Sequence, residues 1–209
     1  MSASLTWGKR LAATAVAALA VAALPGTASA AAAQSIPFTC KTRLSGEWID
    51  VTDYARGVDV TAPATAAPGE SFDVVIDPQP IYPVPAFNKE LRGVEWSYAL
   101  PTNAGLDDHK LSGGSGLGDS KVTTSVEGSK LTVKISGPLP GGAEFDPPTL
   151  TLSFTAPRSG SVEVKPGGSS YDDLGFTWER LHPETGEWDP FLCFPDQAKP
   201  VVLSSTAVS

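Results

Sequence analysis

Histidine is nearly absent from this chain, which limits the chemistry that the protein can carry out. The 209 residues include only two histidines, His109 and His182, and these lie far apart in the sequence. Histidine supplies the base in Ser/His/Asp hydrolases and is a common zinc ligand, so these two residues are the candidates for either role. Both lie among polar, turn-forming residues, where a histidine is ordinarily solvated. We therefore rank a hydrolase or lyase below a non-catalytic function.

Recognisable catalytic motifs are also lacking. Residues 105–120, GLDDHKLSGGSGLGDS, combine aspartates, His109 and serines, but they do not contain the GxSxG spacing of a nucleophile elbow. The chain has no GxxxxGK[ST] phosphate loop and no strand-to-helix glycine motif for a dinucleotide. We interpret the segment as a mobile loop rich in glycine and serine, and we expect no cofactor.

Two acidic pairs, Asp107 with Asp108 and Asp172 with Asp173, are the candidates for a metal site. Hard cations such as Ca²⁺ bind several loop carboxylates in many extracellular modules. The chain has no DxDxDG calcium loop, so we favour solvated acids at strand ends, with weak Ca²⁺ binding as the alternative. A pair of catalytic carboxylates, as in a glycosidase, remains an alternative, because two carboxylates need only lie close together in space.

The single long apolar run is too short to span a membrane as a helix. It covers residues 11–24, follows Lys9 and Arg10, and precedes the small residues Ala28 and Ala30. About 20 apolar residues are needed for a transmembrane helix, whereas this pattern is typical of a secretory signal peptide. We predict a signal peptide over residues 1–30 and one domain over residues 31–209, without a transmembrane segment.

Basic residues are scarce in the predicted mature chain, which has 13 of them against 23 acidic residues and a net charge of −10. Such a chain repels phosphate backbones, so we expect no nucleic-acid partner. No cysteine follows the apolar run directly, as it would in a lipoprotein, and the C-terminal VVLSSTAVS is too short and polar for an anchor. We therefore expect a monomer that is secreted, extracellular or in the cell wall.

Only two cysteines are present, Cys40 and Cys193. An exported chain meets an oxidising compartment, where a disulfide is the economical interpretation. Neither a CxxC motif nor a neighbouring histidine supports a reactive or metal-bound thiol at Cys40. We predict that the two cysteines form one structural disulfide.

Sustained helical periodicity is missing, whereas alternation with a period of two recurs between glycine, proline, asparagine and aspartate residues. SFDVVID, VEWSYAL, KLTVKIS and TLTLSFT each place apolar residues on one face. VTTSVEGSKLTVKI is typical of a hairpin with Glu127 and Gly128 near its tip. The pattern predicts an all-β protein, an immunoglobulin-like antiparallel sandwich of two sheets with about nine or ten strands.

The segment GFTWERLHPETGEWDPFLCFP, residues 175–195, gathers one histidine, four acidic residues and two tryptophans. Apolar residues alternate with polar ones on both sides of HPETGE, which supplies proline and glycine for a turn. We interpret the segment as the last hairpin and place His182, Glu184 and Glu187 at or beside its solvent-facing tip.

A proline-rich segment over residues 77–91, DPQPIYPVPAFNKEL, contains the apolar residues Ile81, Tyr82, Val84 and Phe87. One interpretation is an edge segment that covers the core, which we favour because apolar residues between strands are usually buried. The other is an exposed contact surface for a partner or an apolar ligand. In the second case these four residues are the candidate contact site.

The chain resembles a poorly characterised family of small exported actinobacterial proteins. The matching pieces are FTCKTRLSG, VTAPATAAPGESFDVVIDP, LSGGSGLG, ISGPLPGGAEFDPPTLTLSFTA, SYDDLGFTW and CFPDQAKPVVLSSTAV, in that order. The resemblance implies one β-sandwich with a disulfide between its terminal regions, and it transfers no catalytic residue. Some members are named cyclase or dehydratase, but no motif here supports those activities.

We expect a secreted, non-catalytic binding or cell-envelope module for a protein, glycan or apolar ligand. The alternative is a carrier of an apolar small molecule or lipid between the two sheets, which requires an apolar cavity of at least about 300 Å³.

Overall fold

The computed structural model describes residues 31–44 and 46–209, so the predicted signal peptide over residues 1–30 lies outside the described residues. Every regular element in this part of the chain is a β-strand, and it contains no helix that could cross a membrane. The strands are β1 (Ala32–Leu44), β2 (Glu47–Thr61), β3 (Thr65–Ala66), β4 (Ser71–Pro78), β5 (Glu90–Ala99), β6 (Leu106–Ser112), β7 (Val122–Glu127), β8 (Lys130–Ile135), β9 (Leu139–Pro140), β10 (Thr149–Thr155), β11 (Gly160–Pro166), β12 (Phe176–Leu181), β13 (Trp188–Pro195) and β14 (Ser204–Val208).

The predicted alternation is confirmed in the core strands. The apolar residues that the pattern places on one face of each run are at most 9% exposed: Phe72, Val74 and Ile76 in β4, Val94, Trp96, Tyr98 and Leu100 in and after β5, Leu131, Val133 and Ile135 in β8, and Leu150, Leu152 and Phe154 in β10. The polar residues between them lie on the opposite face, because successive side chains of a strand alternate between faces, and Ser97 and Thr151 among them are also buried. Both predicted hairpins also form, as β7 with β8 and as β12 with β13.

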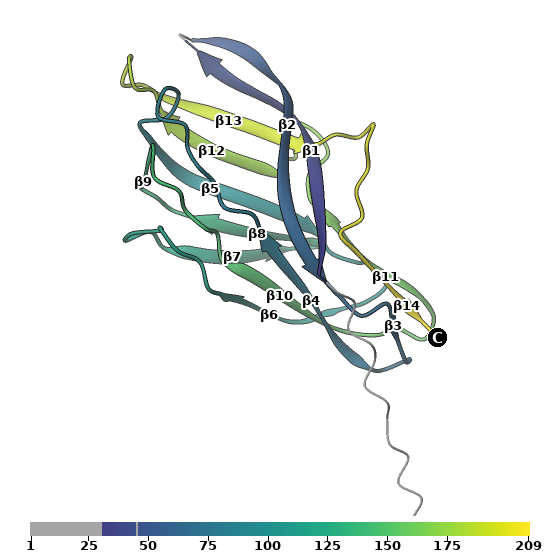
Figure 1. Ribbon diagram of the computed structural model, residues 1–209. Helices are drawn as coiled ribbons and strands as arrows, with labels where there is room; N and C mark the ends of the chain where they lie inside the picture. The colour runs from purple at the N-terminus through teal and green to yellow at the C-terminus, as the bar shows by residue number, and fades with distance from the viewer. Residues whose placement is uncertain (1–30, 45) are drawn as a thin grey trace, which may run out of the picture.

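The strands form a β-sandwich whose two layers are joined by the long β1–β2 hairpin. One layer contains β7, β8, β5, β12 and β13, and the other contains β4, β10 and β6. Strand β1 pairs with β13 over Phe38–Thr42, whereas the end of β2 pairs with β4 over Val58–Thr61. The hairpin therefore belongs to both layers, and Figure 1 shows it crossing over β12 and β13.

The described residues form fourteen strands where the sequence predicts nine or ten. Two of them, β3 and β9, are only two residues long and have no alternation that the sequence could reveal. Strand β14 pairs with β3 in parallel, which departs from a purely antiparallel sandwich. Residues 106–112, interpreted from the sequence as part of a mobile loop, form β6 and pair with β10, so that interpretation is wrong.

The predicted disulfide between Cys40 and Cys193 is confirmed. The two residues are direct neighbours across the β1–β13 ladder and are 2% and 0% exposed. They close a loop whose ends are 153 residues apart in the sequence. The bond therefore fixes the β1–β2 hairpin on the last hairpin of the chain.

Removing this disulfide should destabilise the protein substantially. In the double variant Cys40→Ala/Cys193→Ala we expect a loss of about 2 to 5 kcal/mol, because the unfolded chain regains the entropy that the crosslink removes. At about 2 to 4 °C per kcal/mol, the melting temperature should fall by roughly ten degrees in calorimetry. Two free thiols in the denatured, unreduced secreted protein would contradict the assignment.

Candidate functional site

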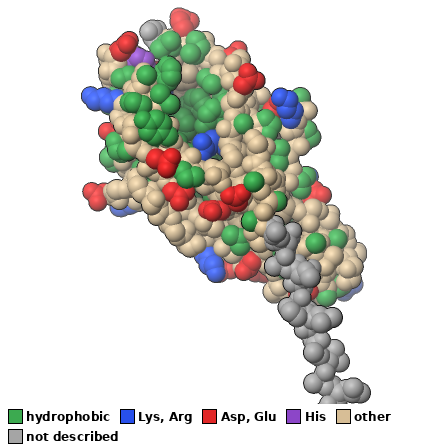
Figure 2. Space-filling view, viewed as in Figure 1, with side chains coloured by type: hydrophobic (Ala, Val, Ile, Leu, Met, Phe, Trp, Pro, Cys, Tyr) green, Lys and Arg blue, Asp and Glu red, His purple; other side chains and the backbone are tan. Residues whose placement is uncertain are grey.

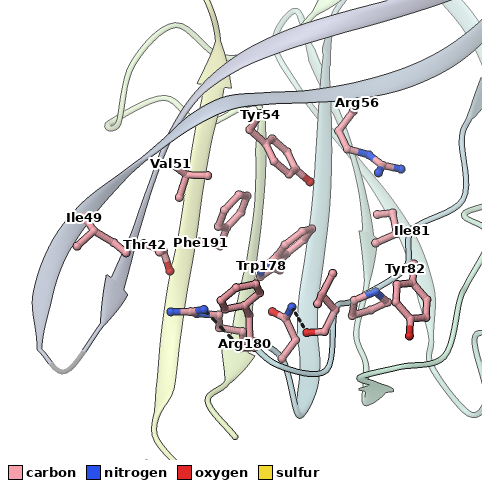
Figure 3. Close-up of a pocket in the computed structure, with 14 residues that line it drawn as sticks. Thr42, Ile49, Val51, Tyr54, Arg56, Ile81, Tyr82, Trp178, Arg180 and Phe191 are labelled. Carbon is pink, nitrogen blue, oxygen red and sulfur yellow. Dashed lines mark hydrogen bonds between the residues drawn. The ribbon is translucent and has the colours of Figure 1, made fainter.

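A groove of about 360 Å³ lies between β2 and the proline-rich segment, above β12 and β13. Figure 2 shows hydrophobic side chains gathered around a hollow on this face, and Figure 3 shows the groove at close range. All four predicted contact residues, Ile81, Tyr82, Val84 and Phe87, line it. The other lining residues are Thr42, Ile49, Val51, Tyr54, Arg56, Pro83, Asn88, Trp178, Arg180 and Phe191.

The floor of the groove is aromatic. Trp178 of β12 and Phe191 of β13 are paired across the hairpin, and their rings stack with centroids 4.6 Å apart. The Tyr54 ring meets Phe191 edge-on at 5.1 Å, and Figure 3 shows it reaching down from β2. Stacked and edge-to-face contacts of this kind add stability beyond the apolar area that they bury. The floor is therefore a fixed apolar platform.

An extra residue in β2 brings four side chains of that strand into the groove. The pairing with β1 passes from Val51 opposite Cys40 to Tyr54 opposite Phe38, and Asp53 has a φ of 55°. Such a β-bulge reverses which residues of the alternation face inward. Ile49 and Val51 before the bulge, and Tyr54 and Arg56 after it, consequently line the same groove.

The proline-rich segment forms the opposite wall and agrees with both sequence interpretations in part. Ile81 is 3% exposed and exchanges two backbone hydrogen bonds with Phe145, of 2.8 and 3.0 Å, so it covers core. In contrast, Tyr82, Val84 and Phe87 are 52%, 44% and 59% exposed. The interpretation of the whole segment as core cover, which the sequence favours, is therefore wrong at these three positions. The extended chain directs Tyr82 and Val84 outward by alternation, and Phe87 lies in a turn that its N–H closes onto the Val84 carbonyl at 3.0 Å.

Arg180 connects the walls from below. Its side chain is buried; Nη2 donates to the Arg43 carbonyl at 2.7 Å, and Nη1 donates to the Phe87 carbonyl at 3.4 Å. Burial lowers the pKa of the Arg180 guanidinium, and the nearby Asp189 carboxylate opposes this shift. Arg180 keeps its charge at neutral pH, because the ordinary arginine pKa lies far above it.

Arg56 closes the end of the groove that is nearer to β4. Its Nη2 donates to the Pro80 carbonyl at 2.9 Å, which ties β2 to the proline-rich segment. Burial raises the pKa of the neighbouring Tyr54 phenol above its usual range, although Arg56 opposes the shift. The phenol is therefore neutral at physiological pH and does not compensate the charge of Arg56.

Three N–H groups at the groove have no hydrogen-bond partner among the described residues. They are Nε of Arg56, Nε of Arg180 and the indole Nε1 of Trp178. A buried donor without an acceptor costs about 1 to 3 kcal/mol. The groove thus combines an apolar lining with donors and positive charge, and none of its lining residues is acidic.

The two histidines do not lie in this groove. His182 is 6% exposed, and its Nδ1 accepts hydrogen bonds from the backbone N–H groups of Glu184 and Thr185. The prediction of a solvent-facing histidine is therefore wrong, because the ring folds back to hold the turn. His109 lies on β6 and bonds to the Thr124 hydroxyl at 2.9 Å, which joins the edges of the two layers.

The four calcium candidates fall in two separate places. Asp107 and Asp108 lie on β6, where Asp107 accepts from Thr155 and Asp108 from the His109 N–H. Asp173 forms an ion pair with Lys130 at 2.6 Å, and this hydrogen bond lowers its pKa, whereas Asp172 is exposed. Within residues 31–44 and 46–209, no three histidine, cysteine or acidic side chains are grouped as a metal site.

The sequence reveals one wall of the groove and misses the floor and the opposite wall. Proline marks the segment that contains Tyr82 and Phe87, whereas nothing local associates it with Trp178 or Arg180, which are 96 and 93 residues further on. The useful signal is the alternation of Trp178 and Arg180 on one face of a strand. It predicts their shared orientation, and only the fold shows what they face.

No family model and no curated protein match the chain. It is similar in structure to a Corynebacterium diphtheriae protein whose name describes it as membrane anchored, with 14% identity and a TM-score of 0.50. That match covers 85% of this chain and 38% of the other, so the chain spans well under half of that protein.

Cohesin modules give further matches over 73% of this chain. The module of a family 33 glycoside hydrolase from Clostridium perfringens has 11% identity, 95% coverage of its own chain and a TM-score of 0.40. A non-cellulosomal cohesin from Archaeoglobus fulgidus has 12% identity, 91% coverage and a TM-score of 0.35. At these identities the likeness concerns the fold alone.

Replacing Arg180 should loosen the groove. In Arg180→Met we expect the free energy of unfolding to fall by about 2 to 3 kcal/mol, because two carbonyls lose a charged donor in a buried place. The control is Arg92→Met, whose ion pair with Glu179 has both side chains about half exposed and should cost under about 1 kcal/mol. Equal losses for both variants in urea unfolding would contradict the role of Arg180.

The phenol of Tyr54 should make the protein less stable in alkali. Its pKa is raised in the folded state above the ordinary value of 10.0, so above that pH the unfolded state releases its proton first and the free energy of unfolding falls. The contribution of Tyr54 to this slope should stay below about 1.4 kcal/mol per pH unit, which is the limit for one proton. Tyr54→Phe should reduce the slope of the free energy of unfolding against pH, measured by urea unfolding. The part of the slope that the buried Tyr98 contributes should stay. An unchanged slope would contradict the assignment.

Proposed function

We propose that the protein is an exported, non-catalytic binding module whose groove holds apolar side chains of a partner protein. The observation that carries this proposal is a rim of exposed apolar side chains around an aromatic floor. Ile49, Tyr82, Val84 and Phe87 are between 41% and 59% exposed, and all four line the groove. Contiguous exposed apolar surface of this kind is typical of an interaction site.

The energy available from covering this rim is sufficient for specific binding. Full burial of one large apolar side chain stabilises a complex by about 1.5 to 3 kcal/mol. Trp178 and Phe191 already lie in place under the rim, packed against each other. A partner therefore meets a surface whose central aromatic groups need little ordering, which reduces the entropic cost of binding.

The shape of the groove favours a protein partner over an apolar small molecule carried between the layers. Its volume exceeds the roughly 300 Å³ that such a carrier requires. However, the groove opens at the surface, where Val84 and Phe87 on its rim are 44% and 59% exposed, so a small molecule in it would not be enclosed between the layers. Large side chains such as Phe145, Phe154 and Phe176, each at most 1% exposed, fill the space between the layers.

The lining of the groove supports a non-catalytic role. Its charged residues are Arg56 and Arg180, and the set of lining residues contains neither a carboxylate nor a histidine. General acid and base catalysis at neutral pH ordinarily uses one of those groups. Both arginines also hold backbone carbonyls of the walls, which is a structural task.

The predicted signal peptide and the Cys40–Cys193 disulfide support a location outside the cytoplasm, because disulfides persist in oxidising compartments. We place the protein in the extracellular space or the cell envelope on these grounds. Membership of the exported actinobacterial family, which the sequence resemblance suggests, is part of the same proposal.

Photo-crosslinking in the cells that secrete the protein tests this function. A photo-reactive amino acid in place of Val84 should give a discrete adduct with another protein. The same amino acid in place of Val126 is the control, because Val126 is similarly exposed, at 43%, but lies on β7 outside the groove. The same adducts from both positions, or none from Val84, would overturn the proposal.

A further inference from the structure

We propose that the partner contributes an extended peptide segment, which adds a strand to the open edge of β2 and fills the groove. This inference rests on the proposed function and specifies the kind of partner and its mode of binding. Strand addition uses main-chain hydrogen bonds for affinity and pockets for alternate side chains for specificity. Both features are present on this face of the molecule.

The first feature is an unpaired strand edge. Strand β2 pairs with β1 from Glu47 to Val60, but with β4 only over Val58–Thr61. Residues 47–57 therefore have a strand partner on one side only within the described fold. An edge of this length is a template for another extended chain unless something covers it.

The backbone groups on that edge can be identified from the neighbouring bonds. The Pro37 carbonyl of β1 accepts from the Asp196 N–H and so points away from β2. The backbone N–H and C=O groups of successive residues in a strand point alternately to its two sides, so those of Cys40 and Thr42 point toward β2. Their partners Val51 and Ile49 then point back to β1, which leaves Trp48 and Asp50 with N–H and C=O groups on the open edge.

The second feature is the adjacent groove, whose opposite wall cannot complete the ladder. The last backbone–backbone hydrogen bond between the two walls is the Gln79 N–H donating to the Gly57 carbonyl at 3.0 Å. The proline-rich segment then continues past Pro80, Pro83 and Pro85, which have no N–H to donate. It diverges from β2, and the groove occupies the space where another strand would lie.

The chemistry of the groove indicates what this strand contains. Aromatic or aliphatic side chains at every second position would meet Trp178 and Phe191. A carboxylate among them would meet the positive charge of Arg56, in a groove whose lining contains no acidic residue. The partner segment is therefore an apolar, alternating peptide with an acidic residue.

Other strand edges lack this combination. The edges of β6 and β7, which end the two layers, are joined by the bond between His109 and Thr124. The cavity beside them is lined largely by loop residues and by Asp107, Asp108 and His109, so it offers no aromatic floor. The open edge of β2, in contrast, lies beside a groove with an aromatic floor and four exposed apolar side chains.

Peptides selected from a random phage-displayed library on the wild-type protein provide the probe. We expect the selected peptides to contain alternating apolar residues and one acidic residue over about six positions, which is a usual strand length. Each selected peptide is then synthesised in two N-methylated forms. One form has backbone N-methyl groups at the odd-numbered residues, and the other has them at the even-numbered residues. One form should bind about tenfold or more weakly, because its N-methyl groups replace the N–H groups that donate to β2. The other form should keep its affinity.

Protein variants give an independent readout. Asp50→Pro removes an outward N–H without touching the β1 ladder and should weaken the same peptides about tenfold, whereas Asp50→Ala should not. Circular dichroism and thermal unfolding confirm that both variants fold. Equal binding of both N-methylated forms overturns strand addition but leaves the groove function standing, provided that Phe87→Ser weakens the peptides.

Two further outcomes also decide the matter. Peptides that bind Phe87→Ser as tightly as the wild type would overturn both the strand addition and the groove function. A concentration-dependent dimer that Asp50→Pro abolishes, seen by analytical ultracentrifugation, would assign the edge to a second copy of this chain and overturn the proposal of a partner peptide.

Discussion

The end of the ladder between β2 and β4 is the constraint on which the candidate site depends. Antiparallel pairing continues only while both strands can donate and accept, and the chain after β4 runs into repeated prolines. Beyond the hydrogen bond between Gln79 and Gly57 the two segments separate. One layer of the sandwich is consequently incomplete above β12 and β13, where the side chains of Trp178 and Phe191 are 8% and 6% exposed.

Several bonds hold the incomplete layer in place despite this gap. The Cys40–Cys193 disulfide fixes β1 on β13, and the Thr42 hydroxyl donates to the Pro190 carbonyl at 2.9 Å. Arg180 reaches both the hairpin and the proline-rich segment. The walls of the groove are thus attached to the same hairpin, so a ligand does not have to order them. This arrangement explains how a groove with little regular pairing keeps a defined width.

The sequence predicts the core of the sandwich well, because SFDVVID and TLTLSFT alternate strictly and the alternation determines which face is buried. It also points to Tyr82, Val84 and Phe87, since prolines among apolar residues are unusual. It does not reveal β2, where the extra residue at Asp53 breaks the period of two. Nor does it show that His182 is buried, because a turn-forming context looks the same whether the ring points inward or outward.

The central claim is that a partner strand occupies the open edge of β2, and amide hydrogen exchange measures this edge directly. In the free protein, the amides of Trp48 and Asp50 should exchange fast, whereas those of Ile49 and Val51, directed at β1, should be protected. Saturation with a groove-binding peptide should slow Trp48 and Asp50 by about tenfold or more, because their N–H groups gain acceptors. Exchange at these two amides that stays unchanged at saturation would contradict the account.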